Sequence, residues 1–210
     1  MSMKKEVSYV SLVALLIPCL ALVTGCARYK SRPVEQLVTD SSPVHDDEDS
    51  ISYAYRVFNV DDCKKYLDRD VISKGYQPIH VTFTNNSNHT LNFSLKGFNM
   101  PCVPAYEVAN TVHTSTTKRA VGYGVAGLFV WPLLIPAVVD GVGSHEANKK
   151  LDDDFSHKTL QDQLISPRST INGLIFIVAN NFTAPLEMTV TDVATQEKFV
   201  LAPKKARLRI

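Results

Sequence analysis

Short apolar stretches separated by turn residues dominate the chain after Ile51. Gln77–Thr84 alternates apolar and polar side chains, Asn85–Asn88 is typical of a turn, and the alternation resumes over Thr90–Leu95. This arrangement predicts a β-hairpin. Upstream of it, Tyr53–Phe58 has the composition of a first strand.

A second group of strands is predicted near the end of the chain. Gly173–Val178 is a nearly continuous apolar run, Asn180-Asn181 favours a turn, and Leu186–Asp192 and Lys198–Leu201 follow. Strands of this length that are joined by polar turns are typical of antiparallel sheets. We therefore expect one mainly β domain.

Two helices are predicted between the strands. Asp61–Leu67 suits a short helix with Asp61 as its cap. Glu146–Phe155 places Ala147, Leu151 and Phe155 four residues apart, so that one face can be buried. The three acidic residues Asp152, Asp153 and Asp154 are expected on its solvated side.

The strand groups resemble immunoglobulin-like sandwiches of bacterial extracytoplasmic proteins. The similarity comes from the early Asn85-Asn86-Ser87 turn and the late Pro167–Phe176 run, and it covers roughly Tyr53–Leu201 outside the middle of the chain. It implies an antiparallel immunoglobulin-like β-sandwich over residues 51–210, with an apolar, partly helical insert at about 118–160. A fold analogy implies no function.

The centre of that insert is a twenty-residue segment without a charged residue, Ala120–Val139. By length it could cross a bilayer, but its three glycines and two prolines break up a continuous helix. Three interpretations stay open: a bend or helical hairpin packed on the sandwich, a surface that contacts lipid or a partner, and a true span.

The amino terminus has the parts of an export signal: Lys4 and Lys5, an apolar run over Val10–Val23, and small residues before Cys26. Val23-Thr24-Gly25-Cys26 resembles the bacterial lipobox. The resemblance implies cleavage before Cys26, which becomes an N-acyl, S-diacylglyceryl cysteine because its thiolate is the nucleophile.

More than one acyl chain on a single residue anchors a protein stably. An ordinary cleaved signal and an uncleaved anchor helix are the alternatives. Residues 1–25 are thus the predicted lipoprotein signal peptide, and residues 26–50 a flexible tether. The residue after the cysteine is Ala27 and not aspartate, which in a Gram-negative cell favours the outer membrane over the inner one. The acidic run Asp46–Asp49 lacks the spacing and the turn glycine of a calcium loop.

Charge argues against nucleic acid as a partner. The whole chain has 22 basic and 21 acidic residues, and the signal contains Lys4, Lys5 and Glu6. The predicted mature chain is therefore formally neutral, whereas binding to phosphates needs a basic excess.

Cysteine usage suggests one disulfide. Of the four cysteines, Cys19 leaves with the signal and Cys26 is lipidated, so Cys63 and Cys102 remain. Two cysteines in an exported chain favour a Cys63–Cys102 disulfide. Two separate buried thiols are the alternative.

No motif predicts catalysis, a metal or a cofactor. Gly122–Gly127 matches G-x-G-x-x-G, but prolines follow where a nucleotide-binding helix should continue. The six histidines lack metal-ligand spacing and lie at positions 45, 80, 89, 113, 145 and 157. Sequence motifs of serine nucleophiles are absent. We expect no enzyme.

Taken together, these features predict a lipid-anchored, non-catalytic protein of the bacterial cell envelope. Its domain is expected to act as a binding or scaffolding module, and Ala120–Val139 is the expected contact region for an envelope partner. The alternatives are an envelope hydrolase whose site is assembled by folding, and a membrane-remodelling or pore-associated protein that uses the apolar insert.

Overall fold

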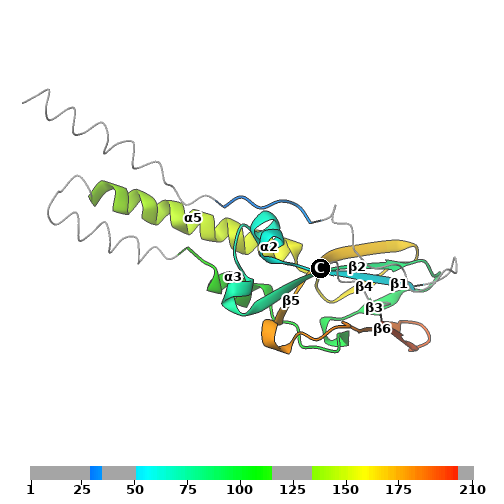
Figure 1. Ribbon diagram of the computed structural model, residues 1–210. Helices are drawn as coiled ribbons and strands as arrows, with labels where there is room; N and C mark the ends of the chain where they lie inside the picture. Colours follow the sequence, from blue (N-terminus) through cyan, green and yellow to red (C-terminus); the bar gives the residue numbers. More distant parts are fainter. Residues whose placement is uncertain (1–28, 35–50, 115–133, 203–210) are drawn as a thin grey trace, which may run out of the picture. The chain divides into compact units, whose positions relative to one another are not determined.

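The computed structural model describes residues 29–34, 51–114 and 134–202, except for the side chains of 134–144. Within these residues the fold is mainly β, with two antiparallel sheets and few helices (Figure 1). Both sheets belong to one compact unit, Lys30–His113 with Leu151–Ile210. Thr114–Lys150 belongs to a second unit.

The first sheet has three strands in the order β1-β2-β5. Its strands are β1 (Ile51–Val57), β2 (Tyr76–Asn85) and β5 (Ser169–Val178). β2 is the central strand and pairs along its whole length with β5, from Tyr76 opposite Val178 to Asn85 opposite Ser169. Buried and half-buried residues alternate along β1, as expected when one face of a strand meets a core.

The second sheet has four strands in the order β4-β3-β6-β7. They are β4 (Gln163–Ile165), β3 (Leu91–Phe93), β6 (Met188–Asp192) and β7 (Lys198–Leu201). Side chains from both sheets share one hydrophobic core, including Tyr53, Phe83, Phe93 and Val190, each with no exposed surface.

The predicted hairpin over Gln77–Leu95 is wrong. β2 and β3 form as expected, but they lie in different sheets and do not pair. The chain passes from one sheet to the other after Asn85. The side-chain amide of Asn85 stabilises this passage, because it donates to the carbonyl oxygens of His89 (2.8 Å) and Ser166 (3.1 Å). This buried side chain therefore holds together the turns that connect the two sheets.

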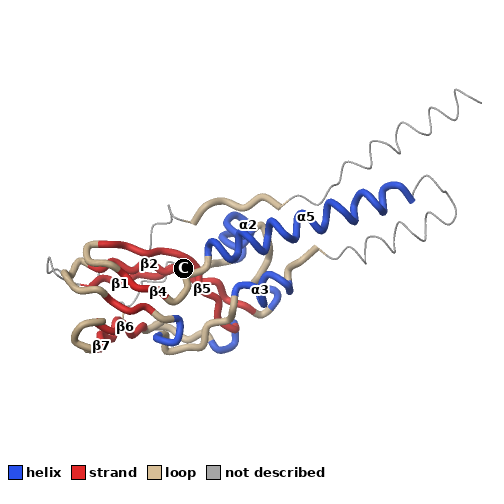
Figure 2. Tube along the Cα trace, turned by 180° about the vertical axis from the view of Figure 1, so that it is seen from behind, coloured by secondary structure: helices blue, strands red, loops and turns tan. Residues whose placement is uncertain are grey.

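Helices gather at one end of the first sheet, which we call the helical end (Figure 2). They are α2 (Val60–Leu67), α3 (Ala105–Thr111) and the last residues of α5 (Leu134–Lys158). Phe155 stacks on Phe176 of β5 with ring centroids 5.6 Å apart and planes 6° apart. A second buried layer thus covers the face of β5 that points away from the shared core.

The helix predictions need three corrections. α2 is capped by Asn59 and not by Asp61, because the Asn59 side chain accepts from the amide of Asp62 at 2.8 Å. α5 is much longer than the predicted Glu146–Phe155. Its acidic run is not simply solvated, because Asp152 and Asp154 bind other side chains. The burial of Ala147, Leu151 and Phe155 is confirmed.

The opposite end of the two long strands is formed by turns, and we call it the turn end. It includes the turns after Asn85 and after Asp192 and the start of β5 at Ser169. His89 and Asp192 join two of these turns with an N–O distance of 2.7 Å. Ten residues of extended strand separate the ends by about 30 Å.

Most of the predicted apolar segment lies outside the described residues. This applies to residues 115–133, including Gly122–Gly127, whereas Leu134–Val139 belongs to α5. Among the described residues, no helix is long and apolar enough to cross a membrane.

Candidate functional site

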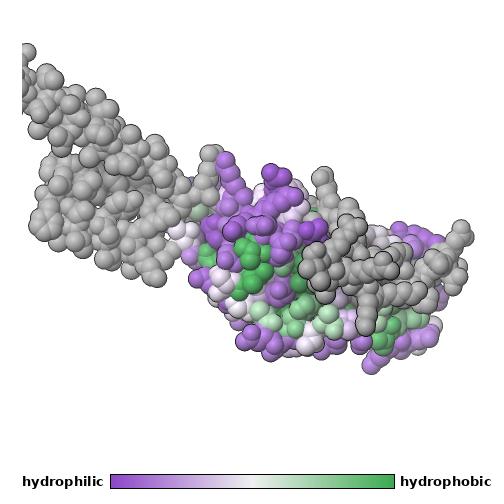
Figure 3. Space-filling model, in the orientation of Figure 1, coloured by the Kyte–Doolittle hydropathy of each residue, from purple (hydrophilic) through white to green (hydrophobic). Residues whose placement is uncertain are grey.

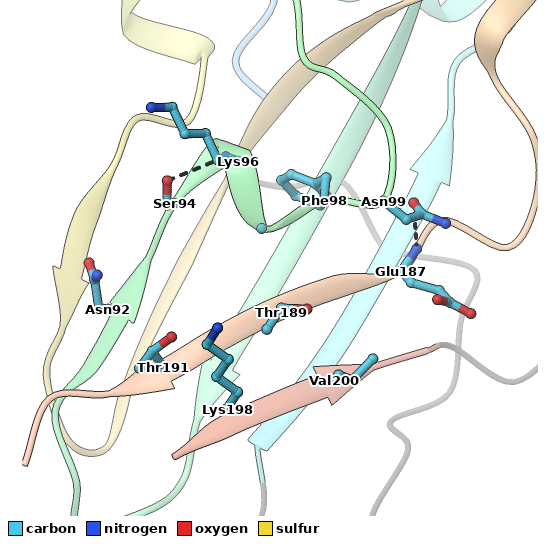
Figure 4. Close-up of a pocket in the computed structure, with 11 residues that line it drawn as sticks. Asn92, Ser94, Lys96, Phe98, Asn99, Glu187, Thr189, Thr191, Lys198 and Val200 are labelled. Carbon is cyan, nitrogen blue, oxygen red and sulfur yellow. Dashed lines mark hydrogen bonds between the residues drawn. The ribbon is translucent and has the colours of Figure 1, made fainter. Parts of the chain in front are cut away.

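A groove of about 480 Å³ lies on the outer face of the four-stranded sheet (Figure 4). Its floor consists of side chains from three neighbouring strands. Asn92 of β3 lies opposite Thr191 of β6, which lies opposite Lys198 of β7. The next row pairs Thr189 with Val200. The groove therefore runs across strands that the core already holds in register.

The floor is polar because successive side chains of a strand point to opposite faces of the sheet. Met188, Val190 and Asp192 are buried, so Thr189 and Thr191 between them point to the other face. The same alternation exposes Lys198 and Val200 of β7, the latter with 67% of its surface accessible. In Figure 1, α2 and α3 lie at the helical end and not beside the labels of β3 and β6.

One wall of the groove is the short turn after β3, η3 (Leu95–Gly97). Asp162 holds it in place by accepting from the Ser94 hydroxyl at 2.9 Å and from the Leu95 amide at 2.7 Å. Gly97 packs against the carbonyl oxygen of Thr189 so closely that a β-carbon would overlap with it. The wall therefore needs a glycine at this position.

The wall continues at Asn99, which binds the segment just before β6. Its backbone amide donates to the Glu187 carbonyl at 3.1 Å, and its side-chain oxygen accepts from the Glu187 amide at 3.1 Å. Its side-chain amide also donates to the Pro185 carbonyl at 3.3 Å. These bonds fix both sides of the groove before any partner binds, which lowers the entropy cost of binding.

The groove is lined by groups that can form hydrogen bonds and ion pairs. Its described lining offers hydroxyls, amides, the ammonium groups of Lys96 and Lys198 and the carboxylate of Glu187, and it has no histidine or cysteine. The Ser94 hydroxyl donates to Asp162, which also accepts from the Leu95 amide, so this hydrogen bond holds the wall in place.

A second ordered feature is the segment Lys30–Val34, which we call the strap. The amide of Lys30 donates to Asp68 Oδ2 at 2.9 Å, and the amide of Arg32 donates to the Lys65 carbonyl at 3.2 Å. Val34 is buried, with 2% of its surface exposed. The predicted tether over residues 26–50 is therefore docked on α2 in this part.

Ser31 joins the strap to α5 through a buried ion pair. Lys158 Nζ lies 2.6 Å from Asp154 Oδ2, 2.8 Å from Ser31 Oγ and 2.7 Å from the Tyr66 carbonyl. The Ser31 hydroxyl in turn donates to Asp154 Oδ2 at 2.9 Å. The three donors of an ammonium group are thus all used.

A serine beside a buried lysine invites comparison with Ser–Lys hydrolases, in which a neutral lysine removes the serine proton. Here Lys158 is paired with Asp154 and donates to Ser31, while the serine proton points to Asp154. A lysine in this arrangement cannot accept that proton. The cluster therefore attaches the strap and does not form a nucleophile.

Five of the six histidines, at positions 80, 89, 113, 145 and 157, lie in the described residues. His80 is buried in β2, opposite Arg56, and His113 Nε2 lies 2.6 Å from Asp152 Oδ1. His89 binds Asp192, and His157 contacts the Asp153 carbonyl on α5. The described residues include no cluster of three or more metal-binding side chains.

The Asp192 carboxylate stabilises the turn end. Hydrogen bonds from the Thr195 amide, and then from the Ala194 amide and from His89, lower its pKa against the opposing effect of burial. The carboxylate therefore stays ionised in the folded protein under mildly acidic conditions.

Cys63 and Cys102 are free thiols in the structure. Cys63 lies in α2, whereas Cys102 lies beside Ile177 of β5. The predicted disulfide is therefore not formed, and the two separate thiols of the alternative are present. Burial, followed by nearby acidic groups, raises the pKa of Cys63 to about 11 and that of Cys102 to about 12, so neither is an activated nucleophile.

Sequence reasoning missed the groove and the strap. The alternation of apolar and polar residues in β6 could have identified the threonines of the floor. No sequence pattern near Leu95–Gly97 indicated that these residues form a wall. Cys26 lies outside the described residues, as do Gly122–Gly127 and most of Ala120–Val139. No family model, curated protein or solved structure matches the chain, so the groove and the strap are interpreted from their own chemistry.

Proposed function

We propose that this chain is a bacterial lipoprotein of the cell envelope whose β domain is a non-catalytic binding module. Lipid on Cys26 anchors it, with the outer membrane favoured if the cell is Gram-negative. The domain binds a polar partner in the groove on the four-stranded sheet. The Ala120–Val139 region remains the predicted contact with an envelope protein, and the groove is a binding site in addition to it.

We further propose that the two sheets form an immunoglobulin-like sandwich. If β1 to β7 are lettered A, B, C, C′, E, F and G, the two sheets have the orders A-B-E and C′-C-F-G. In immunoglobulin domains, strands C, F and G share one sheet and A, B and E the other. Strand order supports this assignment, and the helices between β3 and β4 are an addition to it.

The observation that supports binding is the uncovered, preformed groove. The outward face of the first sheet is covered at the helical end by aromatic and aliphatic side chains, including Phe155. The outward face of the second sheet has instead a polar, walled groove of about 480 Å³. Pockets of this size suit small molecules or a short stretch of polymer.

The lining indicates the kind of partner. Hydroxyl and amide groups of Asn92, Thr189 and Thr191 offer both donors and acceptors. Lys96 and Lys198 add two positive charges, whereas Glu187 adds one negative charge. We therefore expect an extended polar ligand that is neutral or acidic.

Mass spectrometry of the mature amino terminus tests the anchor. We expect the native chain to begin at Cys26 with the mass of the attached lipid, and the Cys26→Ala variant to be neither lipidated nor cleaved there. A native chain that keeps residues 1–25, or that begins elsewhere without lipid, contradicts the proposal.

Photocrosslinking in growing cells tests the groove. A photoreactive residue at Thr191 should give a discrete adduct, and the same residue at Thr170 on the other sheet should not. Co-expressed protein without the photoreactive residue should reduce the yield of this adduct, and it should do so less when it carries Lys198→Glu. Adducts of equal yield at both positions, or none at Thr191, contradict a binding role for the groove.

A further inference from the structure

The strap shortens the connection between the predicted anchor and the domain. Cys26 and Lys30 are four residues apart, and a chain spans at most about 3.6 Å per residue, or about 14 Å in all. A flexible tether that continued to residue 50 would have allowed several times that distance. If Cys26 is lipidated, the docked strap therefore starts close to the bilayer.

The strap is attached at the helical end of the domain. Its partners are Lys65 and Asp68 of the α2 region and the Asp154–Lys158 pair of α5. Figure 1 shows the strap, in blue, beside α2. The turn end is about 30 Å away along β2. The two ends should consequently lie at different distances from the membrane.

Charge on this surface favours phospholipid headgroups. Lys30 and Arg32 of the strap are exposed, as are Lys64 and Lys65 in the last turn of α2. Three acids near this surface are paired within the domain: Asp62 with Arg56, Asp68 with Arg69 and Asp154 with Lys158. Asp61 of α2 and Asp153 of α5 are exposed, so the four exposed basic side chains outnumber the exposed acids. Figure 3 shows a strongly hydrophilic surface above the sheets in the same region. Basic side chains near an anionic lipid surface are attracted to it within about a Debye length.

We propose that the strap and the last turn of α2 are the membrane-facing surface of the domain, and that Lys30, Arg32, Lys64 and Lys65 contact anionic phospholipid headgroups. The turn end then points away from the bilayer. This orientation rests on the proposed lipidation of Cys26, and it adds to it a defined lipid-contacting surface.

The experiment uses the full lipidated chain in vesicles of phosphatidylethanolamine and phosphatidylglycerol that contain a nitroxide-headgroup lipid. A fluorophore is attached to Lys65→Cys at the helical end or to Ala194→Cys at the turn end. Both variants have Cys63→Ala and Cys102→Ala, and Cys26 is blocked by its thioether. The Lys65 substitution spares the strap, because Arg32 binds only the backbone carbonyl of residue 65.

We expect several-fold stronger quenching at position 65 than at position 194. Equal quenching, or stronger quenching at position 194, overturns the orientation. Lipidation is checked on the same sample by mass spectrometry, so an unlipidated chain refutes the anchor, whereas a lipidated chain without the difference refutes only the orientation.

Charge reversal tests the headgroup contact. Arg32→Glu with Lys64→Glu should weaken quenching at position 65 on anionic vesicles and leave it unchanged on phosphatidylcholine vesicles. The matched control, Lys96→Glu with Lys198→Glu, makes the same change of charge in the groove and should have no effect. Circular dichroism confirms that each variant is folded. Equal effects of both pairs, or none from the first, overturn the role of the basic surface.

Discussion

Removal of the Asp154 charge should destabilise the domain more than removal of its lysine partner. Lys158 is only 6% exposed and donates to one carboxylate and two neutral oxygens, whereas Asp154 is 25% exposed. In Asp154→Asn the ammonium stays buried without a counterion. Breaking a fully buried pair in this way costs about 3–5 kcal/mol, so with Asp154 a quarter exposed we expect about 2–4 kcal/mol.

The companion variant Lys158→Met should cost less. The Asp154 carboxylate can reach water and keeps the hydroxyl donor of Ser31. The Tyr66 carbonyl loses its lysine donor, which costs about 1–2 kcal/mol. The double variant should be less destabilised than the sum of the two single variants by about 1–3 kcal/mol.

Urea unfolding of the purified chain, followed by far-ultraviolet circular dichroism, measures these differences. Asp153→Asn is the matched control, because it makes the same chemical change at an exposed position of the same helix. It should change the free energy of unfolding by no more than about 0.5 kcal/mol. If Asp154→Asn behaves like this control, or if Lys158→Met is the more damaging change, the argument from buried charge is wrong.

Three further predictions test the strap, the turn end and the groove. Val34→Asp puts a charge on a side chain that is 2% exposed and should release the strap from the domain. Trypsin should then cleave after Lys30 at least about ten times faster than in the native chain. An unchanged rate in a timed digest contradicts docking of the strap. The pKa of Asp192 is lowered from its ordinary value of 3.8. The stabilisation by the Asp192 carboxylate is complete above that value and is lost as the pH falls through the lower pKa of the folded state. Asp192→Asn should therefore flatten the decline of Tm below about pH 4. Parallel plots of Tm against pH for the two proteins refute this. Gly97→Ala, which overlaps the Thr189 carbonyl, should cost about 1–3 kcal/mol in urea unfolding, and a neutral effect shows that the wall can move.

Local pattern predicted six of the strands in the described residues but missed the short strand β4 (Gln163–Ile165). Lys198–Leu201 is found as expected, and Leu186–Asp192 is shortened by two residues to β6. These segments alternate between core and solvent, and that period is visible in the sequence. Which strands pair was harder to predict, because a polar turn such as Asn85–Asn88 can connect two strands of a hairpin or two strands of different sheets. Only the distant acceptor on Ser166 distinguishes the two.

The candidate sites depend on contacts between residues far apart in the chain. Ser31 is separated from Asp154 by 123 residues and from Lys158 by 127, so no local signal marks the strap as ordered. The groove wall depends likewise on Asp162, which reaches Leu95 across 67 residues. The prediction of a tether depended on the missing hydrophobic periodicity before Asp49, but missing periodicity does not show whether a segment is docked.

The strap changes what the proposed anchor implies for partners. A long flexible tether would let the domain sample a wide shell around Cys26, with little preferred orientation. Docking at Lys30–Val34 leaves only a few residues between lipid and domain, so a partner must be reached near the membrane or from the turn end, about 30 Å further out. The groove lies on the second sheet and not on the helix-covered face of β5. A membrane-facing strap therefore leaves the groove accessible, and lipid anchoring and ligand binding can occur in the same molecule.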